Sequence, residues 1–108
     1  MNFALTLLSE LEANGMRYIE SISQHVASRK LADAGDVAHS LKGAAGILGA
    51  EVLRVTAGEI ESAAHANVME STTLLVEELR QEMERCLQQI PKIRAGAFIN
   101  QIRNRLKD

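Results

Sequence analysis

Apolar residues recur every three or four positions along four segments of the chain, which is the spacing of one buried face of an α-helix. The segments cover about residues 3–28, 29–48, 51–66 and 71–90. Because short connections between helices of this length favour antiparallel neighbours, we predict an all-α, up-down-up-down four-helix bundle. Its core comprises about residues 3–90 of a single domain of 108 residues.

The positions predicted to face the core are mostly leucine, isoleucine, valine and alanine. In the first two segments they are Leu8, Leu11, Tyr18 or Ile19, Ile22 and Val26, followed by Leu31, Ala34, Ala38, Leu41, Ala45 and Leu48. In the last two segments they are Leu53, Ala57, Ile60 and Ala64, followed by Thr72, Leu75 or Val76, Leu79, Met83, Cys86 and Ile90.

The ends of the helices are predicted from residues that favour caps and breaks. Ser28 is expected to cap the second helix, and Gly49 to end it in the left-handed conformation. Ser71 is expected to cap the fourth helix, and Pro91 to end or kink it. Residues 92–107 repeat the helical spacing, so they form a C-terminal helical extension, either as part of the fourth helix or as a fifth.

Composition and charge restrict the function. A net charge of −2 argues against a general nucleic-acid or membrane-surface binder, since such proteins need a basic excess. No segment approaches the length and apolarity of a membrane span, so we expect a cytoplasmic protein. We also expect a monomer. The single cysteine, Cys86, cannot form an internal disulfide and lies on the fourth apolar stripe, which favours a buried core residue.

His39 lies in the stretch Ala38-His-Ser-Leu-Lys-Gly-Ala-Ala-Gly-Ile-Leu-Gly49. At 100° per residue, the helix face that carries His39 also carries small or charged residues. These are Gly35, Asp36, Lys42, Gly43 and Gly46. The apolar stripe of the segment lies on the opposite side, so the imidazole is predicted to point into solvent, where a partner can approach it closely.

This arrangement suits reversible phosphorylation of the imidazole. Near neutral pH a large fraction of histidine is uncharged and nucleophilic, and a phosphorylated imidazole remains a phosphoryl donor. The Lys42 ammonium, one turn away, would offset the added charge of about −2 on a phosphoryl group. We therefore predict His39 as phosphoacceptor, Lys42 as the stabilising cation, and Gly35, Asp36, Gly43 and Gly46 as docking residues.

The same stretch resembles the motif of the histidine-containing phosphotransfer (HPt) domain of multistep two-component phosphorelays. That motif reads Ala-His-x-Leu-Lys-Gly, then small residues and Leu-Gly, and it is met by Ala38, His39, Leu41, Lys42, Gly43, Leu48 and Gly49. The resemblance covers roughly residues 5–90. It implies that His39 takes a phosphoryl group from one receiver-domain aspartate and passes it to another. The implied partners are response-regulator receiver domains and a hybrid sensor histidine kinase, and the receiver supplies the magnesium ion, so no cofactor is expected in this chain.

The sequence departs from the family pattern in two places. Only 38 residues precede His39 in this sequence, so we do not expect the family's first short helix within it. Some members carry a glutamine 22 residues after the histidine, near the phosphoryl group, where this chain has Glu61. Because an acid beside a phosphate is unfavourable unless it turns away, Glu61 is not assigned to the site, and its role stays open.

Other readings of the chain remain open. A sensor-kinase phosphoacceptor helix would have an acidic residue after the histidine, whereas Ser40 follows here. No glycine-rich nucleotide loop occurs, so we expect no autonomous ATP-dependent kinase activity. The main alternative is a helical adaptor that binds receiver domains or kinases independently of phosphorylation. No metal site is expected, because His25, His39, His65 and Cys86 lack the spacing of metal ligands.

The C-terminal extension is rich in basic residues. They are Lys92, Arg94, Arg103, Arg105 and Lys107. A run of this kind usually forms a solvated helix face, so no nucleic-acid partner is predicted.

Overall fold

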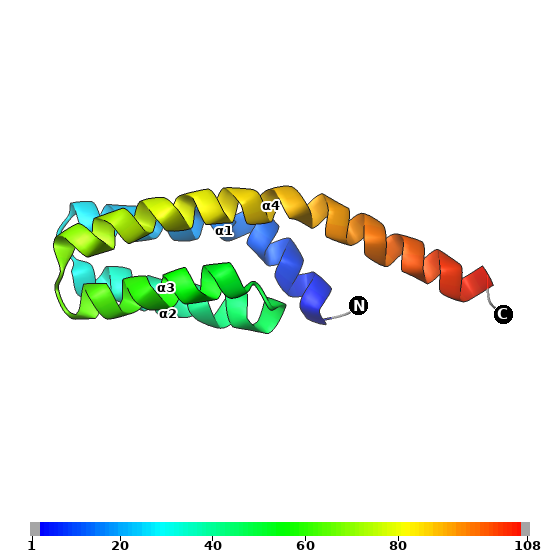
Figure 1. The fold of residues 1–108 in the computed structure, drawn as a ribbon, viewed down its shortest axis with the longest axis horizontal. Helices are drawn as coiled ribbons and strands as arrows, with labels where there is room; N and C mark the ends of the chain where they lie inside the picture. Colours follow the sequence, from blue (N-terminus) through cyan, green and yellow to red (C-terminus); the bar gives the residue numbers. More distant parts are fainter. Residues whose placement is uncertain (1–2, 107–108) are drawn as a thin grey trace.

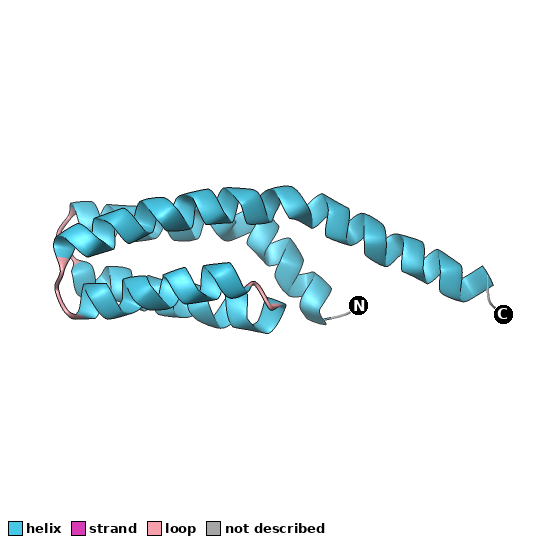
Figure 2. Cartoon of the chain, in the orientation of Figure 1, coloured by secondary structure: helices cyan, strands magenta, loops and turns pink. Residues whose placement is uncertain are grey.

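The computed structural model describes residues 3–106, which form four helices and no strand (Figure 2). The helices are α1 (Phe3–Ala27), α2 (Leu31–Leu48), α3 (Glu51–His65) and α4 (Met69–Leu106). Each helix packs against the next, and α4 also packs against α1, so that the four close a ring around one core (Figure 1). The all-α, up-down-up-down bundle predicted from the sequence is confirmed.

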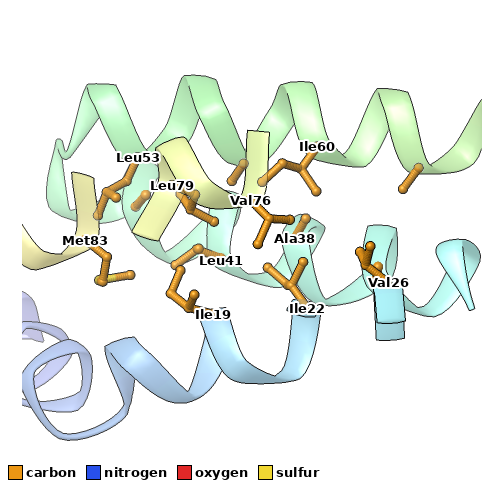
Figure 3. Packing of buried hydrophobic residues seen from close by; sticks show 14 of the residues in the cluster. Ile19, Ile22, Val26, Ala38, Leu41, Leu53, Ile60, Val76, Leu79 and Met83 are labelled. Carbon is orange, nitrogen blue, oxygen red and sulfur yellow. The ribbon is translucent and has the colours of Figure 1, made fainter. Parts of the chain in front are cut away.

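The core consists of the apolar stripes that the sequence indicates (Figure 3). Of the alternatives left open, Ile19 rather than Tyr18 and Val76 rather than Leu75 are buried. Leu48 and Cys86 are only partly buried, at the edge of the core. The periodicity thus identifies which face each helix buries, because only one face of an amphipathic helix can contact its neighbours.

Two of the predicted helix starts are wrong. The N–H of Ser28 donates to the carbonyl of Gln24, so Ser28 ends α1, and α2 starts after Lys30 without a side-chain cap. Ser71 lies inside the first turn of α4, which begins at Met69. The predicted left-handed end of α2 is confirmed, since Gly49 has φ 71° and its N–H donates to the carbonyl of Gly46.

The fourth helix continues through Pro91, so the C-terminal extension belongs to α4 and is not a fifth helix. It projects beyond the end of the bundle, in orange and red in Figure 1. Arg94 ties its beginning to α1, with one guanidinium nitrogen bonded to Glu12 and the other 2.8 Å from Ser9 Oγ. Lys107 lies outside the described residues. No helix within residues 3–106 has an apolar stretch that could cross the bilayer.

Glu82 of α4 is a charged residue buried beside this core, with its side chain facing α3. Its Oε1 is buried and has no hydrogen-bond partner among the described residues. Burial raises the pKa of this carboxyl, while the nearby Thr56 hydroxyl acts in the opposite direction. Because the folded state holds the Glu82 proton more tightly than the unfolded chain does, ionisation of Glu82 lowers the stability of the bundle near neutral pH.

Candidate functional site

One carboxylate contacts both side chains predicted to act at the site, the His39 imidazole and the Lys42 ammonium. Glu61 of α3 contacts His39 Nδ1 through Oε2, and its Oε1 accepts a hydrogen bond from Lys42 Nζ at 2.6 Å. His39 and Lys42 lie one turn apart on α2, so Glu61 bridges them across the seam between the two helices. The site is therefore made by two helices, although the sequence motif lies on only one.

Glu61, which the sequence left unassigned, belongs to the site. The sequence argument considered only the repulsion between an acid and a phosphate. In the unphosphorylated protein the imidazole and the ammonium are both hydrogen-bond donors, and an ionised carboxylate can accept from both at once. Glu61 consequently turns toward His39 and Lys42.

The three side chains differ in their exposure to solvent. His39 is 67% exposed and Lys42 34% exposed, whereas Glu61 is only 18% exposed. The carboxylate thus forms the floor of the site, and the imidazole stands above it on the surface of α2. This confirms the solvent-facing orientation predicted for His39.

The contact with Glu61 also selects one tautomer of the His39 ring. An ionised carboxylate is an acceptor only, so Nδ1 must carry the proton in this contact. In the neutral ring, Nε2 then holds the free lone pair, on the side of the imidazole away from Glu61. This is the nitrogen that an approaching partner would meet.

The neighbours of Glu61 keep it ionised. The hydrogen bond from Lys42 is the main cause that holds the pKa of the Glu61 carboxyl below its usual value, and His39 adds to it. Partial burial acts in the opposite direction. The carboxylate therefore stays charged near neutral pH and can keep accepting the Nδ1 proton.

Two glycines leave open space beside His39 on α2. Gly43 and Gly46 are both exposed. A Cβ at Gly43 would meet no atom within 4 Å among the described residues, and one at Gly46 would lie 3.6 Å from Arg54 Cδ. Larger side chains at these positions would fit the folded monomer but would project into the space above the helix, beside the imidazole.

A third glycine, on α3, supports Lys42 and was missed by sequence reasoning. A Cβ at Gly58 would lie 3.4 Å from Lys42 Cδ, so the stem of the lysine crosses the helix at this point on its way to Glu61. The signal in the sequence is a glycine inside a helical segment, three residues before Glu61. It becomes informative only when the packing of α3 on α2 is known.

Gly35 does not belong to the exposed surface, and the prediction that it is a docking residue is wrong. It is buried under the His65 ring, and a Cβ at this position would lie 2.6 Å from His65 Nε2. Asp36, which is exposed, lies beside it with Oδ1 3.5 Å from the same nitrogen. His65 therefore closes the seam between α2 and α3 one turn away from His39.

Within residues 3–106, no group of three or more His, Cys, Asp or Glu side chains is placed to hold a metal ion. The chemical capacity of the site lies in the nucleophilic His39 ring, the carboxylate under it and the ammonium beside it.

Comparison with known proteins agrees with this geometry. The family model for the Hpt domain matches residues 6–91, which include His39, Lys42 and Glu61 as well as the bundle. The searches of curated proteins and of solved structures gave no significant match. Most of the projecting part of α4 lies beyond the matched region.

The lowered pKa of Glu61 predicts a pH-dependent contribution to stability. The ionised carboxylate stabilises the fold above the ordinary glutamate pKa of about 4.3, and this contribution is lost as the pH falls through the lowered folded-state value. Glu61→Gln should therefore lower the melting temperature by at most a few degrees at pH 7, because ion pairs with exposed partners contribute little. Thermal melts from pH 7 to pH 3 measure the effect.

Glu59→Gln is the matched control, because Glu59 is exposed on the same helix two residues away. It should change the melting temperature less than Glu61→Gln at pH 7. A deficit of Glu61→Gln that is as large at pH 3 as at pH 7 would show that the charge of Glu61 does not stabilise the bundle.

Proposed function

Since the chain belongs to the Hpt domain family, and with it to the histidine phosphotransfer proteins of phosphorelays, we propose that His39 is its phosphoacceptor. His39 would receive the phosphoryl group from the aspartate of one receiver domain and pass it to the aspartate of another. The observation that supports this assignment is the contact between Glu61 and Nδ1, which leaves Nε2 of an exposed ring as a nucleophile.

The transfer needs no proton to move. The Nε2 lone pair attacks the phosphorus of the aspartyl phosphate, the P–O bond to the aspartate breaks, and the aspartate leaves as a carboxylate. The ring keeps its proton on Nδ1 and becomes cationic as the N–P bond forms. The Glu61 carboxylate, already bonded to that proton, stabilises the positive charge. Transfer to the next aspartate reverses these steps and returns a neutral His39.

The Lys42 ammonium would move from Glu61 toward the phosphoryl group when His39 is phosphorylated. In the unphosphorylated site the ammonium is held by Glu61 Oε1. A phosphoryl group on Nε2 adds a charge of about −2 nearby and offers the ammonium a stronger acceptor. Because the Lys42 side chain is one-third exposed and crosses Gly58, it has room to swing toward the phosphoryl oxygens while Glu61 keeps the ring proton.

The docking partner would be a receiver domain that is part of a hybrid sensor kinase or of a response regulator. It would cover the exposed α2 surface at Asp36, Gly43 and Gly46, and bring the magnesium ion that phosphoryl transfer requires. We assign no ATP-dependent kinase activity to the chain itself, which acts as an intermediate between two aspartates.

The phosphoacceptor assignment predicts that His39→Gln abolishes labelling by a phosphorylated receiver domain. His25→Gln and His65→Gln are the matched controls and should accept label at close to the wild-type rate. The label on the wild type should be labile in acid and stable in base, as expected for nitrogen-linked phosphate. Incubation with magnesium and ATP alone should leave the protein unlabelled.

Full labelling of His39→Gln would contradict the assignment. An acid-stable label would point instead to a hydroxyl such as that of Ser40. If receiver domains bind the wild type and His39→Gln equally but label neither, the chain is an adaptor that acts without phosphorylation.

The open space at Gly43 predicts that bulk there blocks the partner and spares the fold. Glycine is a weaker helix former than arginine by up to about 1 kcal/mol, so Gly43→Arg should keep the helical circular dichroism and an equal or higher melting temperature. Receiver binding and phosphotransfer should fall at least tenfold. Titration with a receiver domain, followed by a transfer assay, measures both.

Gly96→Arg is the matched control, since Gly96 is also an unobstructed glycine of a helix, on the projecting part of α4. It adds the same side chain and charge but should leave receiver binding unchanged. Unfolding of Gly43→Arg would mean that this glycine is needed for packing, and normal transfer would place the docking surface elsewhere.

A further inference from the structure

The charges of the chain are divided between its two parts. Residues 1–91 contain 7 basic and 13 acidic side chains, a net charge of −6, whereas residues 92–108 contain 5 basic and 1 acidic, a net charge of +4. Residues 92–106 of the second part form the end of α4 that projects beyond the bundle (Figure 1). The overall charge of −2 conceals this division.

The outward face of α4 follows the same division. At 100° per residue this face lies roughly opposite the core positions Thr72, Leu79, Met83 and Ile90. The residues within about 60° of that direction are all exposed, and in chain order they are Glu70, Leu74, Glu77, Glu78, Gln81, Glu84, Arg85, Gln88, Lys92, Ala95, Gly96, Ile99, Ile102, Arg103 and Leu106. The face is therefore mostly acidic over the bundle, where Arg85 is its one cation, and apolar and basic over the projecting end.

The apolar half of the outward face is unusual for a surface. Ile99, Ile102 and Leu106 are 47%, 40% and 80% exposed, and Lys92, Arg103 and Arg105 lie on either side of them. On the acidic half, Leu74 is 67% exposed between carboxylates. The two halves are therefore complementary. Each has exposed apolar side chains, and their charges are of opposite sign.

We propose that two copies of the chain associate through the outward faces of their α4 helices, which run antiparallel about a two-fold axis near Gln88. In this arrangement the apolar stripe of one copy, formed by Ile99, Ile102 and Leu106, lies along Leu74 of the other. The basic residues of each projecting end meet the other copy's Glu70, Glu77 and Glu84. Because the same face serves both copies, the contact closes as a dimer and does not extend into a filament.

Other partners for the apolar stripe agree less well with its position and its charged neighbours. The bundle of the same chain cannot reach it, because the stripe lies on the side of α4 away from the core. Pairing of two projecting ends alone would bring together like charges, which repel. An anionic lipid surface would attract the projecting end but repel a bundle of net charge −6.

The dimer leaves the phosphotransfer site open. The bundle packs α2 and α4 at opposite corners, each between α1 and α3. His39 on α2 therefore lies away from the outward face of α4, and both copies could bind receiver domains at once. The proposed dimer differs from the monomer expected from the sequence, and the measurements below decide between the two.

The test is the mass of the full chain in solution, measured by sedimentation equilibrium from micromolar to millimolar concentration. The wild type should dimerise, and more weakly at high salt, which screens charge pairs. Ile102→Gln should raise the dissociation constant at least tenfold. The matched control is Ile93→Gln, because Ile93 is 50% exposed but lies on a different side of α4.

Charge reversal tests the antiparallel arrangement. Arg103→Glu with Arg105→Glu lowers the net charge of residues 92–108 from +4 to 0 and places two carboxylates beside the apolar stripe. Glu70→Lys with Glu77→Lys places two ammonium groups on the outward face over the bundle, opposite those two positions. The dissociation constant for self-association of each double variant alone should be at least tenfold higher than that of the wild type. Each variant should keep its helical circular dichroism. An equimolar mixture of the two should form a heterodimer, since each opposite-charge contact is then restored.

Three outcomes would overturn the proposal. These are a wild type that is monomeric at all concentrations, a dimer that neither reversal weakens, and reversed chains that fail to associate when mixed. A monomer that sediments with vesicles containing phosphatidylserine would also overturn it and would make the apolar stripe a lipid-binding surface.

Discussion

The Glu61 carboxylate is the group that holds the candidate site of this bundle together. It contacts the proton-bearing nitrogen of His39 and the ammonium of Lys42, and it comes from a different helix. The site therefore exists only when α3 packs on α2 in one register. Small buried residues on both helices, Ala38 and Ala45 on α2 and Ala57 on α3, allow this close packing, since the side chains at a contact set the distance between helix axes.

The electrostatics of the site suit a phosphoryl group that arrives and leaves again. In the proposed reaction the Glu61 carboxylate would compensate the ring cation of phosphohistidine, and the Lys42 ammonium would compensate the phosphoryl oxygens, so each developing charge would have a partner already in place. Neither partner is deeply buried, and both can exchange with water. A fully buried cation would hold the phosphoryl group more firmly and would oppose its onward transfer.

The sequence is sufficient for the features that depend on local periodicity and incomplete for those that depend on contacts between helices. The buried faces follow from the spacing of apolar residues, and the left-handed end at Gly49 follows from the residue type. Ser28 and Ser71 are not caps, because α2 begins later than expected, at Leu31, and α4 begins earlier, at Met69. Backbone hydrogen bonds set these starting points, and they do not follow from the residue types. The sequence left Glu61 unassigned and placed Gly35 wrongly, because their neighbours, His39 and His65, are 22 and 30 residues away, on the other helix of the pair.

The most direct test of the account is the ¹⁵N NMR spectrum of the His39 ring, recorded in the unphosphorylated protein and again after phosphorylation by a receiver domain. If Glu61 holds the ring as described, the neutral imidazole carries its proton on Nδ1, and the phosphoryl group is then bonded to Nε2. A neutral ring protonated on Nε2, or a phosphoryl group bonded to Nδ1, would contradict the account.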